Sequence, residues 1–420
     1  MTASPGKWRV LIIVENLPCP FDRRVWQEAL ALRAHGHAVS IICPKGRGYD
    51  RGHEVLEGVH IYRHPLPVEA NSALGYGLEY ASSLLMEFAL AIRIAFTRGF
   101  DVIHACNPPD TIFLIGRFFK LFGKRFIFDH HDINPELYEA KFGRRDVWYR
   151  LLCRLERWTF ATADVSIATN ESYQRIAIER GHMDPAKVFV VRSGADLTRV
   201  RALPPRPELR RGKTHLVGYV GVIGKQEGLD LLLEAVAYMR QTLHRDDVQF
   251  VIVGDGTELA AVRQLARELA LEDCVEFTGR IPDAALWEIM STADVCVNPD
   301  RANEMNDKST MNKILEYMAL GKPIVQFDLT EGRWAAQEAA LYARRHDTAD
   351  FAAKIVELID DPERRAAMGA FGRRRVETQL EWSHQAPRLL AAYDALWHRG
   401  AGPVQVAGSG TRIRIPGSPR

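Results

Sequence analysis

Six of the seven residues from 306 to 312 are polar, and a glutamate, Glu316, follows them on the same predicted helix. We expect hydroxyl side chains to cap the start of this helix and Gly321 to end it, before a β-branched strand. A helix that begins after a strand and a loop presents free backbone N–H groups and the positive end of its dipole, which together bind phosphate. A carboxylate farther along can accept hydrogen bonds from sugar hydroxyls. The stretch predicts a nucleotide-sugar site formed by Asn306, Ser309, Thr310, Met311, Asn312 and Glu316.

Glu316 taken alone has a simpler interpretation. Ile314, Leu315 and Met318 form the apolar side of the predicted helix, and a single glutamate off that side is usually a solvated surface residue. The polar residues before it are unusual for a turn at the edge of a sheet. They favour the functional interpretation over the solvated one.

A second polar run, from Asp129 to Asp132, directly follows a predicted strand at 125–128. Successive side chains of a strand point to opposite faces, so only one of His130 and His131 can face a ligand beyond the carboxyl end of that strand. Such a histidine can exchange a proton near neutral pH, whereas the alternative is a loop histidine with a satisfied hydrogen bond. No third ligand has a suitable spacing, so the sequence predicts no metal site.

Glycines follow the first predicted strand of the second half, at Gly221, Gly224 and Gly228, and Lys225 lies among them. Glycine lets a backbone approach a pyrophosphate closely, and Lys225 could neutralise its charge. The alternative is a tight turn between a strand and a helix, and the spacing fits both interpretations.

Arg23 and Arg24 stand at the expected start of a helix, where positive charge opposes the helix dipole. An anion bound nearby would relieve that repulsion; alternatively, both side chains simply reach solvent. The candidates for acceptor or phosphate contact are Phe21, Arg24, Asn107 and His130, which all lie near the ends of predicted strands.

The elements that must position these residues alternate between strands and helices along the whole chain. This alternation predicts an α/β protein with two doubly wound parallel sheets. A segment rich in proline and arginine interrupts it, and the pattern then starts again. The expected organisation is a first domain at 1–200, a linker at 201–213, a second domain at 214–380, a helix at 381–398 that crosses back to the first domain, and a disordered tail at 399–420.

Composition narrows the classes of function. The net charge of +2 over 420 residues gives no reason to expect a nucleic-acid partner, and the six cysteines show no CxxC pair, which fits a reducing cytoplasm. We expect neither a signal peptide nor a transmembrane helix. Aromatic and basic residues mix at 74–98 and 117–122, where contact with an anionic membrane competes with packing in the core; core packing is the commoner fate of such aromatics.

Over about residues 8–398 the chain resembles glycosyltransferases of the GT-B fold, in the large retaining family 4. The likeness is strongest at 298–325, at 254–256 and at 277–282, and the runs NDKSTMNKILEYMALGKPIVQFDL and FDHHD resemble a bacterial polysaccharide-biosynthesis subgroup. The resemblance implies two Rossmann-like domains facing across a cleft. It also implies metal-independent transfer of a hexose-type sugar from a nucleotide-diphosphate sugar to a hydroxyl acceptor, with retention of configuration.

Further expectations come with this resemblance. No cofactor is needed besides the nucleotide sugar, which is a co-substrate. The acceptor would be a saccharide or a lipid-linked intermediate of exopolysaccharide or lipopolysaccharide synthesis, and the protein would work in the cytoplasm, in peripheral contact with the inner face of the membrane.

The resemblance also assigns roles to residues. Glu316 would hold the ribose of the donor, Arg280 and Ile281 would border its base, and His131 would lie near its sugar. Backbone N–H groups at 221–224 and 309–311 would stabilise the leaving diphosphate. The expected catalytic residues are His131, Lys225 and Lys308, and the donor site is completed by Gly221, Gly224 and Gly254.

Departures from the family pattern leave alternatives open. The family's first glutamate, eight positions before Glu316, is Lys308 here, and Val222 and Glu227 stand where the glycine-rich loop usually carries basic residues. One alternative is a nucleotide-sugar epimerase of the same fold, with acids such as Asp129 near the reaction. The other is a degenerate transferase that serves as a non-catalytic partner subunit.

Overall fold

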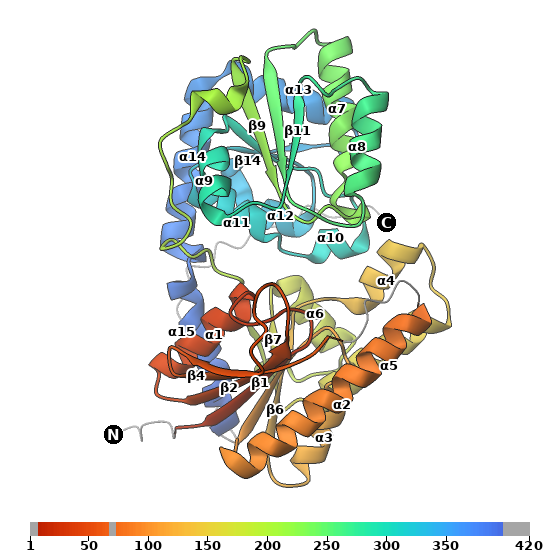
Figure 1. The fold of residues 1–420 in the computed structure, drawn as a ribbon, viewed down its shortest axis with the longest axis vertical. Coiled ribbons are helices and arrows are strands. Elements are labelled where there is room, and N and C mark those ends of the chain that lie inside the picture. The colour runs from red at the N-terminus through yellow and green to blue at the C-terminus, as the bar shows by residue number, and fades with distance from the viewer. Residues whose placement is uncertain (1–6, 67–72, 398–420) are drawn as a thin grey trace, which may run out of the picture.

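The computed structural model describes residues 7–66 and 73–397, and the side chains of 73–80 and of residue 397 are not described (Figure 1). The disordered tail predicted at 399–420 therefore lies outside the described residues. Among the described helices, none combines the length and the apolar composition needed to cross a membrane.

The first sheet has eight strands in the order β3-β4-β2-β1-β5-β6-β7-β8, and only the β3–β4 pair is antiparallel. Consecutive residues of β1, such as Ile12 and Ile13, belong to different cores on the two faces of the sheet, and both are fully buried. This explains the continuous apolar runs in the sequence, since a parallel sheet is covered by helices on both sides. The strands are β1 (Arg9–Val14), β2 (Ala38–Pro44), β3 (His53–Leu56), β4 (Val59–His64), β5 (Val102–Cys106), β6 (Arg125–His130), β7 (Val165–Ala168) and β8 (Val188–Val190).

The second sheet has six strands, all parallel, in the order β11-β10-β9-β12-β13-β14. Its order reverses beside β9, so the loops after β9 and β12 leave the sheet next to one another, as at the ligand sites of doubly wound folds. The strands are β9 (His215–Val220), β10 (Val248–Val253), β11 (Val275–Gly279), β12 (Val295–Asn298), β13 (Ile324–Phe327) and β14 (Ala340–Ala343).

Helices pack on both faces of each sheet (Figure 1). Those of the first half are α1 (Arg23–Ala34), α2 (Ala73–Thr97), α3 (Phe113–Lys120), α4 (Asn134–Phe142), α5 (Val147–Thr162) and α6 (Glu171–Glu179). Those of the second half are α7 (Leu229–Gln241), α8 (Leu259–Glu268), α9 (Asp283–Thr292), α10 (Glu304–Lys308), α11 (Asn312–Ala319), α12 (Thr330–Ala336), α13 (Thr348–Asp360), α14 (Pro362–Arg375) and α15 (Trp382–Trp397).

The last helix, α15, packs against the first sheet although it follows the second in sequence (Figure 1). Leu389 and Tyr393 are buried in the core around β1 and β2. The chain crosses between the halves at two adjacent points, where the N–H of Ala195 donates to the carbonyl of Leu380 and the N–H of Trp382 donates to the carbonyl of Ala195. Burial of α15 thus joins the two sheets into one assembly.

Candidate functional site

The polar stretch at 306–312 meets the first domain directly. The Asn170 Nδ2 atom donates to the carbonyl of Lys308 at 2.8 Å, and the Tyr173 hydroxyl lies 3.0 Å from Ser309 Oγ. Both partners belong to the start of α6, which follows β7 of the first sheet. The carboxyl ends of the two sheets therefore face one another across the domain interface, and the site residues gather there.

The predicted hydroxyl cap of the 306–321 helix is wrong. The stretch forms two helices, α10 and α11, and α11 begins after Met311 with no side-chain cap. Thr310 Oγ1 instead accepts from Asn170 and from Arg192 Nη1, at 3.1 and 3.3 Å. The hydroxyls are used for contact between the domains, so the first N–H groups of α11 have no side-chain cap.

Glu316 is not a solvated surface glutamate, because its carboxylate meets two arginines. Its Oε1 atom lies 3.2 Å from Arg23 Nη1 and 2.9 Å from Arg199 Nη2, and its side chain is 15% exposed. Both arginines also contact Asp283 at the start of α9, each at 3.1 Å. The sequence left open whether Arg23 meets an anion or solvent, and it gave no indication of Arg199 and Asp283, which no local pattern links to Glu316.

Arg24 points the other way, into the first domain. Its Nη2 atom lies 2.9 Å from Asp129 Oδ1 and 3.1 Å from Glu28 Oε1, and its Nε atom lies 3.0 Å from His131 Nε2. Burial alone would lower the pKa of Arg24, but the two carboxylates raise it above its ordinary value. The alternative of a solvated Arg24 is therefore wrong.

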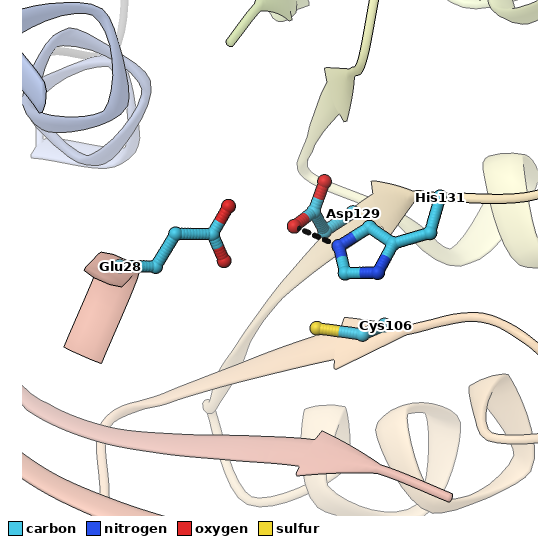
Figure 2. A group of neighbouring side chains, drawn as sticks. All are labelled: Glu28, Cys106, Asp129 and His131. Carbon is cyan, nitrogen blue, oxygen red and sulfur yellow. Dashed lines mark hydrogen bonds and ion pairs between the residues drawn. The ribbon is translucent and has the colours of Figure 1, made fainter. Parts of the chain in front are cut away.

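His131 is held by this buried group. Its Nε2 atom lies 2.6 Å from Asp129 Oδ2 (Figure 2). The same oxygen lies 3.2 Å from His104 Nε2. Burial would raise the pKa of Asp129, but Arg24 and His131 hold it well below its usual range. An ionised Asp129 fixes the orientation of His131, whose side chain is 14% exposed.

Figure 2 shows Glu28, Cys106, Asp129 and His131 converging, and their ligand atoms all lie within 4.8 Å of one another. Such a group can hold a metal in principle. Here the guanidinium of Arg24 already supplies the cation between the carboxylates. Burial, and then the nearby Asp129, raise the pKa of Glu28 well above its usual range, and burial raises that of Cys106. The arginine therefore occupies the position between these carboxyl groups that a cation would take.

His130 and Asn107 do not reach the domain interface as acceptor contacts. His130 is fully buried among the rings of Phe128, Phe160 and Tyr173, with Glu156 at 3.6 Å. Strand alternation turns it to the face opposite Asp129. The buried Asn107 side chain accepts from the backbone N–H of His131 at 2.7 Å and so shapes the loop that carries this histidine.

The glycine-rich loop of the second domain packs against the turn after β10. A Cβ atom at Gly254, where φ is +146°, would collide with the carbonyl oxygen of Gly221, and one at Gly256 would collide with that of Ile223. The glycines therefore allow two loops to lie in contact. Lys225 is exposed on this loop, and the Glu227 carboxylate accepts from the N–H of Gly224 at 3.1 Å.

Lys313 is the basic residue that sequence reasoning missed. Its Nζ atom lies 2.9 Å from Asp300 Oδ1 and 3.4 Å from the Tyr219 hydroxyl. Its Cε atom would lie 3.4 Å from a Cβ atom at Gly221, so it stands against the glycine-rich loop at the start of α11. The signal available in the sequence is a lysine in the first turn of the helix that follows the polar stretch.

Lys308 faces acids of both domains. Its Nζ atom lies 2.5 Å from Glu304 Oε2 and 3.6 Å from Glu136 Oε1 on α4. Arg180 binds the same Glu136 carboxylate through two nitrogens. The lysine in place of the family's glutamate is therefore matched by a carboxylate from the opposite domain.

The remaining predicted residues also lie near the interface or the glycine-rich loop. Arg280 stacks on Phe21 of the first domain, with its guanidinium carbon 4.5 Å from the ring centroid. Ile281 packs with Met311 against the second core. The buried Asn306 donates to the carbonyls of Gln226 and Arg301, each at 2.9 Å, and Asn312 is exposed at the start of α11.

Comparison with known families agrees with this geometry. A family model described as Glycosyltransferase Family 4 matches residues 22–199, and one described as Glycosyl transferases group 1 matches residues 214–361. The two models together cover every strand except β1, and the helices α1, α6, α9, α10 and α11 that carry the site. The chain belongs to glycosyltransferase family 4.

Solved structures show that this family 4 chain has the GT-B fold. Sucrose-phosphate synthase from Thermosynechococcus elongatus superposes with a TM-score of 0.74 at 19% identity, over 93% of this chain and 99% of that one. HepE from Anabaena, solved with UDP and glucose, superposes with a TM-score of 0.71 at 16% identity, over 92% and 99%.

Relatives in sequence include a D-inositol 3-phosphate glycosyltransferase from Thermomonospora curvata, 30% identical over 57% of this chain and 58% of that protein. A 2-deoxystreptamine glucosyltransferase from Streptomyces kanamyceticus is 25% identical over 59% of this chain and 65% of that protein. The family 4 chain thus aligns with less than two thirds of the length of each of these relatives.

Proposed function

We propose that this protein transfers a sugar from a nucleotide-diphosphate sugar to a hydroxyl acceptor, with retention of configuration. The observation that carries the proposal is the position of Glu316 on α11. The start of this helix has no side-chain cap, and Lys313 in its first turn stands against the glycine-rich loop. Ribose hydroxyls and a diphosphate need these two features side by side. The names of the relatives and the UDP and glucose bound to HepE support this class of donor.

The donor would lie mainly on the second domain. Glu316 would accept from the ribose, Arg280 and Ile281 would border the base, and the first N–H groups of α11 with Lys313 would bind the diphosphate. Lys225 is exposed on the same loop and could add a second positive charge. His131, fixed by Asp129, would contact the donor sugar from the first domain. This set needs neither a metal nor a further cofactor, because positive groups of the chain stabilise the leaving diphosphate.

The acceptor would bind to the first domain, and we propose a saccharide or a lipid-linked intermediate of polysaccharide synthesis at the cytoplasmic face of the membrane. The division of the chain into a domain at 1–200, a linker at 201–213 and a domain at 214–380 is part of the same proposal, with 381–398 returning to the first domain. The contacts of α15 with β7, β8 and α1 support that return.

We expect Glu316→Ala to raise the KM for the donor about tenfold to a hundredfold, because it removes hydrogen bonds to a charged group, each worth about 1.5–3 kcal/mol. A thermal-shift screen with UDP, GDP and ADP, with and without magnesium, should show stabilisation of the wild-type protein by one nucleotide and a smaller shift for the variant. Glu234→Ala, an exposed glutamate on helix α7 of the same domain, is the matched control. Equal thermal shifts in Glu316→Ala and the wild type would refute the role of Glu316. If no nucleotide shifts the wild-type protein, the alternative of a non-catalytic partner subunit is favoured.

A glutamate restored at position 308 should impair the enzyme rather than improve it. The new carboxylate of Lys308→Glu would face Glu304 and the buried Glu136, and like charges at such distances cost several kcal/mol. We expect kcat/KM to fall at least about tenfold, while Lys308→Gln, which removes the charge without the repulsion, falls less. Faster transfer by Lys308→Glu than by the wild type would show that the family's glutamate function is recoverable here.

A further inference from the structure

Large apolar side chains are exposed along one side of the first domain. Phe96 is 88% exposed, Leu121 81%, Leu85 70% and Phe122 64%. Single exposed apolar residues are ordinary, but a continuous group of them marks an interaction surface. The group also contains Leu114, Phe118, Val147, Trp148, Leu151 and Trp158.

Contacts between rings connect these residues across three helices. The Phe118 ring on α3 lies 5.0 Å from that of Phe88 on α2 and 5.3 Å from that of Phe122. The Trp158 ring on α5 lies 6.2 Å from that of Phe113 on α3. Figure 1 shows α2, α3 and α5 on the same side of the domain. We call this surface, formed by the exposed residues of α2, α3, the turn after α3, and α5, the aromatic–arginine face.

Arginines accompany the apolar groups. On α5, Val147, Leu151 and Trp158 form one stripe, and Arg150, Arg154 and Arg157 form the adjoining one, as the helical period requires. The other exposed basic residues between 81 and 161 are Arg93, Arg98, Arg117, Lys141, Arg144 and Arg145. Arg144 and Arg145 pair with the partly exposed Asp146 and Glu139. The other exposed arginines of this range outnumber its partly exposed acids, so the face is positive although the chain has a net charge of only +2.

We propose that the aromatic–arginine face docks on an anionic lipid bilayer. Arginine and aromatic side chains together suit the boundary between headgroups and acyl chains, because the guanidinium binds lipid phosphate while the ring enters the apolar layer. This inference deepens the proposed function and rests on it: α4, which precedes α5, contacts α10 of the second domain, so the face borders the interface that would receive a lipid-linked acceptor.

A second copy of the chain fits this face less well. In a symmetric pair each face would meet itself, so the same cluster of arginines would oppose its own copy, while the partly exposed Asp146 and Glu139 already pair with Arg144 and Arg145. Anionic lipid supplies the missing negative charge. Charge complementarity therefore selects a membrane over self-association.

The test is sedimentation of the full-length protein with vesicles of phosphatidylcholine alone or mixed equally with phosphatidylglycerol. We expect binding only to the anionic vesicles, weakened by salt. The variant Arg150→Gln/Arg154→Gln/Arg157→Gln should bind about a hundredfold more weakly, since each cation near an anionic surface contributes about fivefold. Arg263→Gln/Arg267→Gln/Arg374→Gln makes the same charge change on exposed positions of the second half and should bind like the wild type.

A second variant tests the apolar part. Phe96→Ser/Leu121→Ser/Phe122→Ser keeps every charge and should also lose most of the binding, because these residues would enter the bilayer. Absence of wild-type binding to anionic vesicles, or binding unchanged in both face variants, would overturn the inference. A wild-type dimer that Phe96→Ser/Leu121→Ser/Phe122→Ser converts to a monomer would overturn it in favour of self-association. The same variants should keep the wild-type thermal shift with nucleotide, because the aromatic–arginine face lies outside the donor site. Loss of vesicle binding with an unchanged thermal shift therefore concerns the face alone, and loss of the thermal shift concerns the donor site.

Discussion

Arg24→Met should destabilise the protein by about 3–5 kcal/mol at neutral pH, the usual cost of leaving a buried charge without its partner. Arg24 is buried and lies within 3.1 Å of both Asp129 and Glu28, so its removal leaves two carboxyl groups facing one another in the core. Methionine keeps much of the volume, which limits the contribution of a cavity. Chemical denaturation of the variant and the wild type at pH 7 would measure the difference.

The pH dependence of this loss distinguishes charge from packing. In the wild type the pKa of Asp129 is depressed, so its ionisation stabilises the fold at neutral pH, and that stabilisation is lost as the pH falls through the folded pKa. Without Arg24 the folded pKa of Asp129 rises, and the variant gains relative stability as acid neutralises the carboxylate. The difference in the free energy of unfolding between the variant and the wild type should therefore become smaller from pH 7 to pH 5. A difference of constant size would show that Arg24 contributes packing alone.

Arg23→Met is the matched control for this experiment. Arg23 is the neighbouring arginine, but its side chain is 50% exposed and contacts Glu316 and Asp283 across the domain interface. Exposed ion pairs contribute about 0–1 kcal/mol, so this variant should lose little stability and show little dependence on pH.

The sheets could be predicted from the sequence because their strands are short apolar runs in regular alternation with helices. The strand predicted at 125–128 is β6 (Arg125–His130), and the strand expected after Gly321 is β13 (Ile324–Phe327). Short helices were missed: α4, α10 and α12 have nine, five and seven residues, too few for a helical period to show. The edge strand β3, which pairs antiparallel with β4, was also missed.

The site was predictable only where its residues are close in sequence. Glu316 and the polar stretch before it form one segment, and His131 follows its strand directly, so both could be named. Arg199 reaches Glu316 from the end of the first domain, and Asp283 lies at the start of α9 in contact with the same arginine. No periodicity reports such contacts. The group around Asp129 likewise combines Glu28 from α1 with His104 from β5, whose spacing in sequence carries no signal.

Among the residues that the sequence did not point to, Lys313 has the largest functional consequence. The glycine-rich loop lacks the basic residues that the family carries at positions 222 and 227, and Lys313 stands against Gly221 from α11. A cation fixed beside the diphosphate stabilises the charge that develops on the leaving group, and loss of one such group typically costs about a hundredfold to a thousandfold in rate. We expect Lys313→Met to lower kcat/KM for the donor by this amount and to abolish most of the nucleotide thermal shift.

Lys313→Met also leaves Asp300 buried without its partner, so the fold needs its own control. Asp300 is 1% exposed and 2.9 Å from Lys313, and the double variant Lys313→Met/Asp300→Asn removes both charges together. We expect the double variant to regain the stability lost by the single one but none of the lost kcat/KM, because binding of the diphosphate needs the cation itself. Lys313→Arg, which keeps the charge, should retain more activity than either. Recovery of wild-type kcat/KM in the double variant would mean that Lys313 only neutralises Asp300, and the cation for the diphosphate would then be sought at Lys225, which is exposed on the same loop.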